Sequence, residues 1–289
     1  MKADQFRTTT IRRGYVYSYY YESSAGGKPT ILFLHGFPST HRDWASQITY
    51  FAQKGYGIVA PDLLGYGKTS APEDASEYKL QAIGQDVIDI LNDLKVEKVI
   101  AIAHDWGCSL LSRMLNNYIN YFSGAAFLAL GYLSPQPNYD YKTVIAAFNQ
   151  RYGYDIFGYW DFFAADDAVS LTEKNFKAQI DSFYSLLFPD DPLIWKTEMA
   201  PLRKAREWVE QNKQRPRAAF WTAEDKEAHK ATLMQKGPRG AYNWYRAHHR
   251  ALNNADEHAI PQERLNISIP TFLGGATKDY SCLIDAAKA

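Results

Sequence analysis

Cysteine is scarce in this 289-residue chain, and long apolar runs and any excess of one charge are missing. The two cysteines, Cys108 and Cys282, show no metal-ligand spacing, so we expect neither a disulfide framework nor a zinc site. No apolar run is long enough for a transmembrane segment. The 32 basic residues balance 32 acidic ones, which argues against a nucleic-acid partner. Residues 1–5 lack the apolar core of a secretory signal, so we expect a cytoplasmic protein.

The order of the apolar segments predicts the fold class, and an apolar fraction of 46% is ample for a core. Residues 9–22 alternate and are rich in tyrosine, as in an antiparallel hairpin. Short apolar runs then alternate with segments of helical periodicity; we predict strands at 29–34, 56–60, 98–103 and 123–130 and helices at 41–53 and 81–94. This alternation predicts an α/β fold with a mostly parallel sheet flanked by helices.

The composition changes after Gly131. Prolines break the rhythm, and helical, aromatic and charged segments run to about His249 without a strand of the core type. The core pattern resumes at residues 267–275. We therefore divide the chain into an N-terminal part of the core (1–133), a helical cap inserted between core strands (134–250) and a C-terminal part of the core (251–289).

The segment Ala103-His104-Asp105-Trp106-Gly107 joins a predicted strand to a predicted helix. Small residues flank Asp105, as a sharp strand-to-helix turn requires, and such a turn lifts one side chain above the sheet. Aspartate is also common as an ordinary helix cap. A carboxylate in a sharp turn can, however, attack a saturated carbon and leave an ester on the enzyme. We predict that Asp105 is a covalent nucleophile.

A second motif, His35-Gly36-Phe37-Pro38, follows the strand that we expect beside the strand leading to Asp105. In this architecture one oxyanion donor comes from that loop, and the other is the backbone amide after the nucleophile. The predicted oxyanion donors are therefore the amides of Phe37 and Trp106.

With these two motifs the chain resembles the epoxide hydrolases of the α/β-hydrolase superfamily. Residues 61–70 look like the family's loop after the next strand, and Asn243-Trp244-Tyr245-Arg246 is similar to a motif late in its cap. The four motifs occur in the family's order and span essentially the whole chain. The resemblance implies an α/β-hydrolase fold with a helical cap, and conversion of an epoxide to a vicinal diol through an alkyl-enzyme ester on Asp105.

The resemblance also implies two cap tyrosines that hydrogen-bond the epoxide oxygen while the carboxylate opens the ring. Tyr245 matches one position, and the other is assigned to Tyr159, with Tyr152 and Tyr154 as neighbouring alternatives. A phenol has a pKa near 10, so it stays protonated at pH 7 and can share its proton with a developing alkoxide. Further residues of the substrate pocket on this resemblance are His35, Pro38 and Trp160.

The expected substrates are water and an apolar or aromatic epoxide. We expect the epoxide to be apolar or aromatic because of the aromatic residues Trp106, Phe157, Trp160, Phe162 and Phe163. Carboxylate, phenols and amides suffice for the chemistry, so neither a metal nor an organic cofactor is implied. We expect a monomer or a homodimer.

The end of the chain departs from the family's pattern. Asp279 matches the acid that orients a catalytic histidine, which should follow it in the order nucleophile, acid, histidine. All seven histidines precede Asp279, and we interpret His248, His249 and His258 as surface residues rather than relocated bases. We therefore predict that the reaction stalls at the ester. Either the chain is an incomplete version of a longer enzyme, which an apolar strand left at the sheet edge favours, or it is a short protein with little turnover.

Three other functions compete with this one. A haloalkane dehalogenase shares the aspartate and the following tryptophan, but it binds halide with a side chain where this chain has Phe37, which offers no donor. An esterase is disfavoured because Asp105 is not a serine. A catalytically dead binding protein of the same fold would explain the missing base but not the retained nucleophile and tyrosines.

Overall fold

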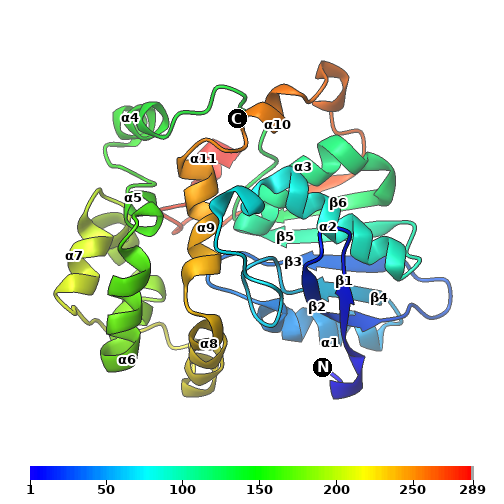
Figure 1. Ribbon diagram of the computed structural model, residues 1–289, viewed down its shortest axis with the longest axis horizontal. Coiled ribbons are helices and arrows are strands. Elements are labelled where there is room, and N and C mark those ends of the chain that lie inside the picture. The colour runs from blue at the N-terminus through cyan, green and yellow to red at the C-terminus, as the bar shows by residue number, and fades with distance from the viewer. Residues whose placement is uncertain (288–289) are drawn as a thin grey trace.

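A seven-stranded sheet forms the centre of the molecule (Figure 1). The computed structural model describes residues 1–287. The strands are β1 (Phe6–Thr10), β2 (Val16–Glu22), β3 (Thr30–Leu34), β4 (Gly57–Pro61), β5 (Val99–His104), β6 (Phe122–Leu128) and β7 (Thr271–Gly274). They lie in the order β1-β2-β4-β3-β5-β6-β7. β1 and β2 pair antiparallel, as does β2 with β4, whereas β4, β3, β5, β6 and β7 are parallel neighbours. The predicted mostly parallel sheet is therefore confirmed.

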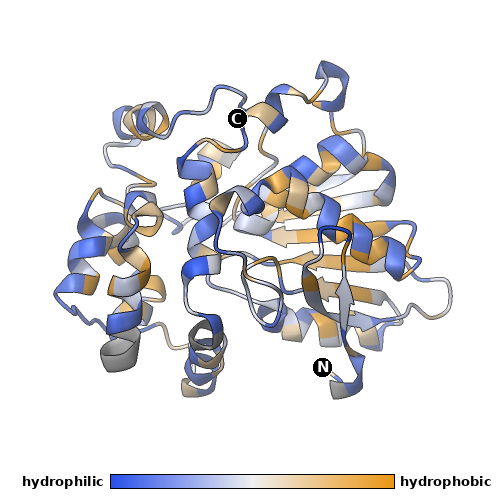
Figure 2. Ribbon diagram, viewed as in Figure 1, coloured by the Kyte–Doolittle hydropathy of each residue, from blue (hydrophilic) through white to orange (hydrophobic). Residues whose placement is uncertain are grey.

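The central strands are apolar on both faces, as expected for parallel strands covered by helices on each side. In β3, Ile31 and Phe33 pack in one apolar cluster with Trp44 and Ile48 of the first helical segment. Leu32, between them, belongs to the larger cluster on the opposite face. Figure 2 shows the same division, with apolar strands inside and hydrophilic helix faces outside.

Three main helices flank the sheet in the first half of the chain: α1 (Ala45–Gln53), α2 (Leu80–Asp93) and α3 (Trp106–Tyr118). The predicted helix over 41–53 begins as a 3-10 turn, η2 (His41–Trp44), capped by Thr40. The Thr40 side chain accepts from the Arg42 amide at 3.2 Å, and the Asp43 carboxylate accepts from the Thr40 amide at 2.8 Å. This reciprocal pair fixes the direction in which the chain enters α1.

The 134–250 segment is helical, and within the described residues none of the seven strands lies in it. An isolated bridge joins Pro189 and Arg217. The α-helices are α4 (Tyr141–Tyr152), α5 (Tyr159–Ala164), α6 (Ala168–Leu187), α7 (Lys204–Glu210), α8 (Ala223–Lys236) and α9 (Arg239–His249). A π-helical turn, η5, spans Trp195–Met199. In Figure 1 these helices form a layer to one side of the sheet, with α9 nearest to it.

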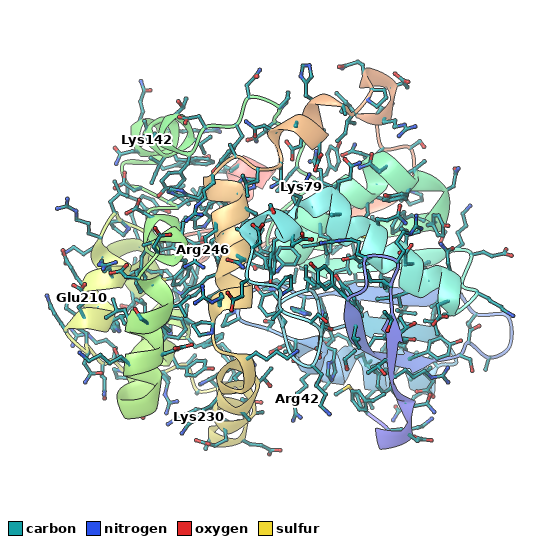
Figure 3. All side chains as sticks on the ribbon, in the orientation of Figure 1. Arg42, Lys79, Lys142, Glu210, Lys230 and Arg246 are labelled. Carbon is teal, nitrogen blue, oxygen red and sulfur yellow. The ribbon has the colours of Figure 1, made fainter. Side chains whose placement is uncertain are left out.

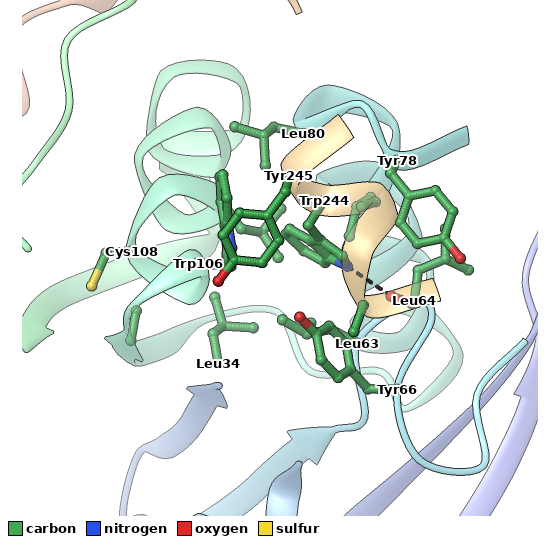
Figure 4. Close-up of a cluster of buried hydrophobic side chains, with 14 of the residues drawn as sticks. Leu34, Leu63, Leu64, Tyr66, Tyr78, Leu80, Trp106, Cys108, Trp244 and Tyr245 are labelled. Atoms are coloured by element: carbon green, nitrogen blue, oxygen red, sulfur yellow. Dashed lines mark hydrogen bonds between the residues drawn. The ribbon is translucent and has the colours of Figure 1, made fainter. Parts of the chain in front are cut away.

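Helix α9 joins that layer to the loops of the sheet. The indole Nε1 of Trp244 donates to the carbonyl of Leu64 at 2.9 Å, drawn as a dashed line in Figure 4. On the other side, the Arg246 guanidinium donates to the carbonyl of Ala165 at 2.8 Å, and Figure 3 shows Arg246 between α9 and α5. α9 is thus fixed to both layers by buried hydrogen bonds.

The remaining elements are short. They are η1 (Ala3–Gln5), η3 (Ala75–Tyr78), η4 (Ile119–Tyr121), α10 (Asn254–His258), η6 (Gln262–Arg264) and α11 (Ile284–Ala287). β7 lies at one edge of the sheet, and Phe272 on it is 61% exposed. In the described part of the chain, no helix has the length and apolar character needed to cross a bilayer.

Helix α2 is capped by a residue distant in sequence. Its own N-cap residue, Lys79, makes no side-chain cap bond, and the Leu80 amide donates instead to the buried Asn253 side chain at 2.8 Å. We expect Asn253→Ala to lower the free energy of unfolding by ~1 kcal/mol, because a helix amide loses its acceptor. Asn253→Asp keeps the acceptor and should lose less. Denaturant unfolding of both variants is the test, and equal stability of Asn253→Ala and wild type would contradict it.

Candidate active site

Asp105 lies in the sharp turn between β5 and α3. Its φ of 54° and ψ of −126° are unusual for a residue with a side chain. The turn also depends on two glycines, because other atoms come too close to their Cα atoms to leave room for a side chain. A Cβ on Gly107 would overlap the carbonyl oxygen of Leu34, and a Cβ on Gly36 would overlap the Asp105 carboxylate. The turn expected from the sequence is therefore present, and it brings the carboxylate against the 35–38 loop.

The two amides predicted as oxyanion donors both interact with the Asp105 carboxylate. The Phe37 amide donates to Oδ1 at 2.7 Å, and the Trp106 amide also hydrogen-bonds to the carboxylate. Burial raises the pKa of Asp105, while His104 and the two amides oppose that shift. The charge of Asp279 raises it further. The carboxylate is therefore desolvated and held by fixed backbone dipoles.

Tyr159 of α5 and Tyr245 of α9 lie together beside Asp105. Their ring centroids are 6.0 Å apart, and they are 6% and 3% exposed. Burial raises the pKa of both phenols well above the usual value of 10, and the Asp105 charge adds to the shift. Both side chains are therefore hydrogen-bond donors at neutral pH. Figure 4 shows the Tyr245 ring against Trp106, at a centroid distance of 5.2 Å.

The alternatives to Tyr159 have other environments. The Tyr154 hydroxyl donates to the carbonyl of Tyr280 at 2.6 Å, and Tyr152 stacks on Phe148. Neither tyrosine is among the residues that line the cavity next to Asp105, whereas Tyr159 is. The sequence could not separate the three, because the difference depends on how α5 packs.

A cavity of about 230 Å³ opens next to the carboxylate. At that end it is lined by Asp105, Trp106, Tyr159 and Trp160. Phe157 also lines it, as expected, whereas Phe162 and Phe163 are buried in the core, 3% and 0% exposed. Aromatic lining that the sequence did not single out comes from Tyr139 and Phe148.

His35 and Pro38, expected in the substrate pocket, lie outside the lining of this cavity. His35 is buried beneath the loop, where Nδ1 donates to the Gly36 carbonyl at 2.9 Å and Nε2 accepts from the Leu63 amide at 3.0 Å. Burial lowers the pKa of His35, so the ring is neutral. Pro38 lines a separate small cleft against α8. The two hydrogen bonds of the His35 ring thus join the loop at Gly36 to the loop at Leu63.

Asp279 lies near enough to Asp105 for its charge to raise that residue's pKa. Its Oδ1 accepts from the amides of Ser281 at 2.9 Å and Cys282 at 2.7 Å, so its own turn holds it. Within the described residues, no histidine hydrogen-bonds to Asp279. Ser281 lines the cavity and lies 3.2 Å from the Tyr159 hydroxyl.

His248 corrects one expectation from the sequence. Far from lying on the surface, it lines the cavity, and its ring packs 4.2 Å from that of Tyr139 and 5.2 Å from that of Trp160. Burial, with the nearby Arg113 charge, lowers the pKa of His248 to about 4. The sequence did contain a sign of this inward position, because His248 follows Tyr245 by three residues and so lies on the same face of α9. His258 is exposed, and His249 lies 3.7 Å from the Asp161 carboxylate.

Among the described residues, no group of three or more His, Cys, Asp or Glu side chains is arranged to hold a metal ion. The polar groups gathered at the site are the Asp105 carboxylate, the Tyr159 and Tyr245 phenols and the Phe37 and Trp106 amides. Asp105, Trp106 and Tyr159 line the cavity, whereas Tyr245 and Phe37 are not among its lining residues and reach the site through their contacts with Trp106 and Asp105.

Comparisons with known proteins agree with this geometry. Residues 29–279 match the family model described as alpha/beta hydrolase fold. The chain is 28% identical over 221 residues to bifunctional epoxide hydrolase 2 of Sus scrofa, covering 76% of this chain and 38% of that protein. It is 26% identical over 230 residues to epoxide hydrolase 2 of Siraitia grosvenorii, covering 78% and 68%.

Similarity extends to solved structures. Epoxide hydrolase A from Mycobacterium thermoresistibile matches with a TM-score of 0.74 at 24% identity, covering 93% of this chain and 81% of that one. The resemblance predicted from the motifs is confirmed, because relatives of this chain carry the name epoxide hydrolase. The chain spans less than half of the Sus scrofa protein's length.

The raised pKa of Asp105 makes a prediction about stability. The pKa of this carboxyl is 3.8 in the unfolded chain and higher in the folded protein. Between these two pKa values the unfolded chain loses its proton first, so the free energy of unfolding falls as pH rises. Asp105→Asn removes this ionisation, so we expect Tm at pH 7 to rise by ~2–4 °C, a shift that ~1 kcal/mol produces in a domain of this size. The difference should shrink as pH falls toward 3.8.

Asp62→Asn is the matched control, and thermal unfolding of both variants over a pH series is the measurement. Asp62 is also buried, but a 2.6 Å hydrogen bond with His41 lowers its pKa despite burial. Its substitution should therefore lower Tm at pH 7. A fall in Tm for both variants would contradict the assignment for Asp105.

Proposed function

Because this chain belongs to the α/β-hydrolase fold family, we propose that it is an epoxide hydrolase that opens its substrate by forming an ester on Asp105. The observation that carries the proposal is the grouping of the half-buried Asp105 carboxylate with the buried Tyr159 and Tyr245 phenols. We assign residues 1–133 and the part from 251 onward to the hydrolase core, and 134–250 to a cap that supplies both tyrosines.

The first half-reaction uses Asp105 and the two tyrosines. A carboxylate oxygen of Asp105 attacks one epoxide carbon, and the bond from that carbon to the epoxide oxygen breaks. The oxygen leaves as an alkoxide, which takes a proton from Tyr159 or Tyr245. The product is a hydroxyalkyl ester of Asp105, and the phenolate recovers its proton from water. Burial favours this step because the carboxylate is less solvated than an exposed one.

The second half-reaction returns Asp105 to its starting form. Water adds to the ester carbonyl and loses a proton, and the Phe37 and Trp106 amides hold the oxyanion. Collapse breaks the bond to the alkyl oxygen, which takes that proton and leaves as the vicinal diol. Asp105 returns as a carboxylate by giving its proton to the hydroxide left from the first half-reaction. A general base typically contributes 10²–10⁴-fold to such a step. Among the described residues, His248 is the histidine that lines the cavity, and a pKa of about 4 makes it a weak base. We propose that the ester forms faster than it is hydrolysed.

The lining of the cavity supports an apolar or aromatic epoxide as the substrate. Trp106 and Trp160 face each other beside Asp105 with ring centroids 5.2 Å apart, and aryl groups pack well against such rings. A haloalkane dehalogenase is disfavoured, because Phe37 offers no side-chain donor to a halide and the tyrosine pair has no use in halide release.

Intact-mass measurement with an aryl epoxide tests the proposal. We expect the protein to gain the mass of one epoxide, with the modified peptide containing Asp105 and diol appearing more slowly than adduct. Asp105→Asn, which keeps the size of the side chain, should gain no mass. Absence of both adduct and diol in the wild type would sink the proposal and favour a binding protein of the same fold.

The tyrosines are tested separately by the rate of adduct formation. Tyr245→Phe and Tyr159→Phe each remove one proton donor to the leaving oxygen, so each should slow alkylation by ~10-fold or more, and the double variant by ~10²-fold or more. Tyr154→Phe is the control, because its hydroxyl bonds to the Tyr280 carbonyl instead. If the double variant alkylates at the wild-type rate, the tyrosines only pack.

A further inference from the structure

The cavity has a second end that the proposed chemistry does not use. Polar side chains line the cavity toward Arg113: Arg113, Ser134, Gln136, Tyr139, His248 and Glu257. His248 borders the aromatic walls, because its ring lies 5.2 Å from that of Trp160. Arg113 and Glu257 are 4% and 8% exposed, so these charges are buried. Buried charges in an otherwise aromatic cavity are costly unless they bind something.

Several donors at this end have no hydrogen-bond acceptor among the described residues. One guanidinium nitrogen of Arg113, Nη2, donates to the Leu133 carbonyl. Its Nε and Nη1 are buried without hydrogen-bond partners, as are the Tyr139 hydroxyl and Nδ1 of His248. A buried donor left without an acceptor destabilises the protein, because it has lost its hydrogen bonds to water. Arg113 of α3, Tyr139 of the loop before α4 and His248 of α9 therefore present unsatisfied polar atoms around one cavity.

The charges at this end determine which acceptor fits. Glu257 Oε1 lies 3.8 Å from Arg113 Nε, so the guanidinium charge is already balanced although its hydrogen bonds are not made. His248 is neutral at pH 7 because burial lowers its pKa to about 4. Asp105, which also lines the cavity, is a second carboxylate and is half-buried. An anionic ligand would bring a third negative charge, whereas a neutral acceptor would not.

The two ends are joined by one face of α3. Asp105, Ser109 and Arg113 recur at four-residue intervals and all line the cavity. At 1.5 Å per residue, eight residues separate the Cα atoms of Asp105 and Arg113 by about 12 Å along the helix axis. A single small molecule can therefore reach both ends.

We propose that this polar end is a substrate subsite that selects epoxides carrying a neutral hydrogen-bond acceptor, such as a carbonyl oxygen, remote from the ring. The inference rests on the proposed function and goes further, by naming the substrate class. The acceptor receives hydrogen bonds from Arg113 and Tyr139 while the ring lies at Asp105. Neither a hydrocarbon epoxide nor a carboxylate-bearing one satisfies these donors without an added cost.

Three aryl epoxides of similar shape test this subsite, with para-isopropyl, para-acetyl or para-carboxylate groups. The alkylation rate of Asp105 is measured by intact mass for each compound, in the wild type and in variants. Comparing the acetyl-to-isopropyl ratio between proteins cancels the intrinsic reactivity of the compounds. We expect the ratio to fall about 3- to 10-fold in Tyr139→Phe, the value of one neutral hydrogen bond, and more in Arg113→Met.

Tyr152→Phe is the matched control. Its hydroxyl is also buried without a partner, but outside the cavity lining, so the ratio should not change. Tyr139→Phe removes a hydroxyl that makes no hydrogen bond, so it should fold even if Arg113→Met does not. An unchanged ratio in Tyr139→Phe and in folded Arg113→Met overturns the subsite, as does a faster reaction of the carboxylate compound than of the acetyl compound.

Failure of the proposed function gives a different result. If no compound alkylates the wild type, the unreactive para-acetyl and para-isopropyl alkylbenzenes are compared by thermal shift. A larger rise in Tm with the ketone, lost in Tyr139→Phe, supports the subsite without the reaction. Equal shifts with the two compounds overturn it.

Discussion

The hydrogen bond from the Phe37 amide to the Asp105 carboxylate is the contact on which the rest of the site depends. It joins the loops that follow two neighbouring parallel strands, whose register pairs Leu34 with Ala103. Both loops leave the same edge of the sheet, so no long-range adjustment is needed to bring them together. The bond also requires glycine at position 36, because any side chain there would occupy the space of the carboxylate.

Burial has opposite chemical consequences for the acid and the phenols in this site. It raises the pKa of Asp105, which leaves its ionised form poorly solvated, and it raises the pKa of Tyr159 and Tyr245, which keeps them protonated. One apolar environment, formed by the aromatic rings of α5 and α9, thus suits the roles that we propose for the carboxylate and the two phenols. The same burial therefore accounts for the pKa shifts of all three side chains.

Much of this arrangement was readable from the sequence, because its signals are local. The strand before Asp105, the small residues around it and the Thr40 cap each depend on a few consecutive residues. What could not be read depends on packing between distant segments. The inward position of His248 follows from how the 134–250 segment lies against the sheet, and the cap on α2 follows from where the chain places Asn253 after that segment. The motif gives the place of His35 in the loop but not the direction of its ring, which here hydrogen-bonds to the Gly36 carbonyl and the Leu63 amide.

Asp105 immediately precedes helix α3, and Arg113 lies two turns along that helix, which packs against the sheet. The length of the cavity is consequently set by the backbone of one helix, whereas its width is set by side chains from α4, α5 and α9. Sequence changes in those helices would reshape the walls, but the span from the reactive end to the far end would stay the same. The length of the cavity is thus fixed by the fold, whereas its width can change with the side chains that line it.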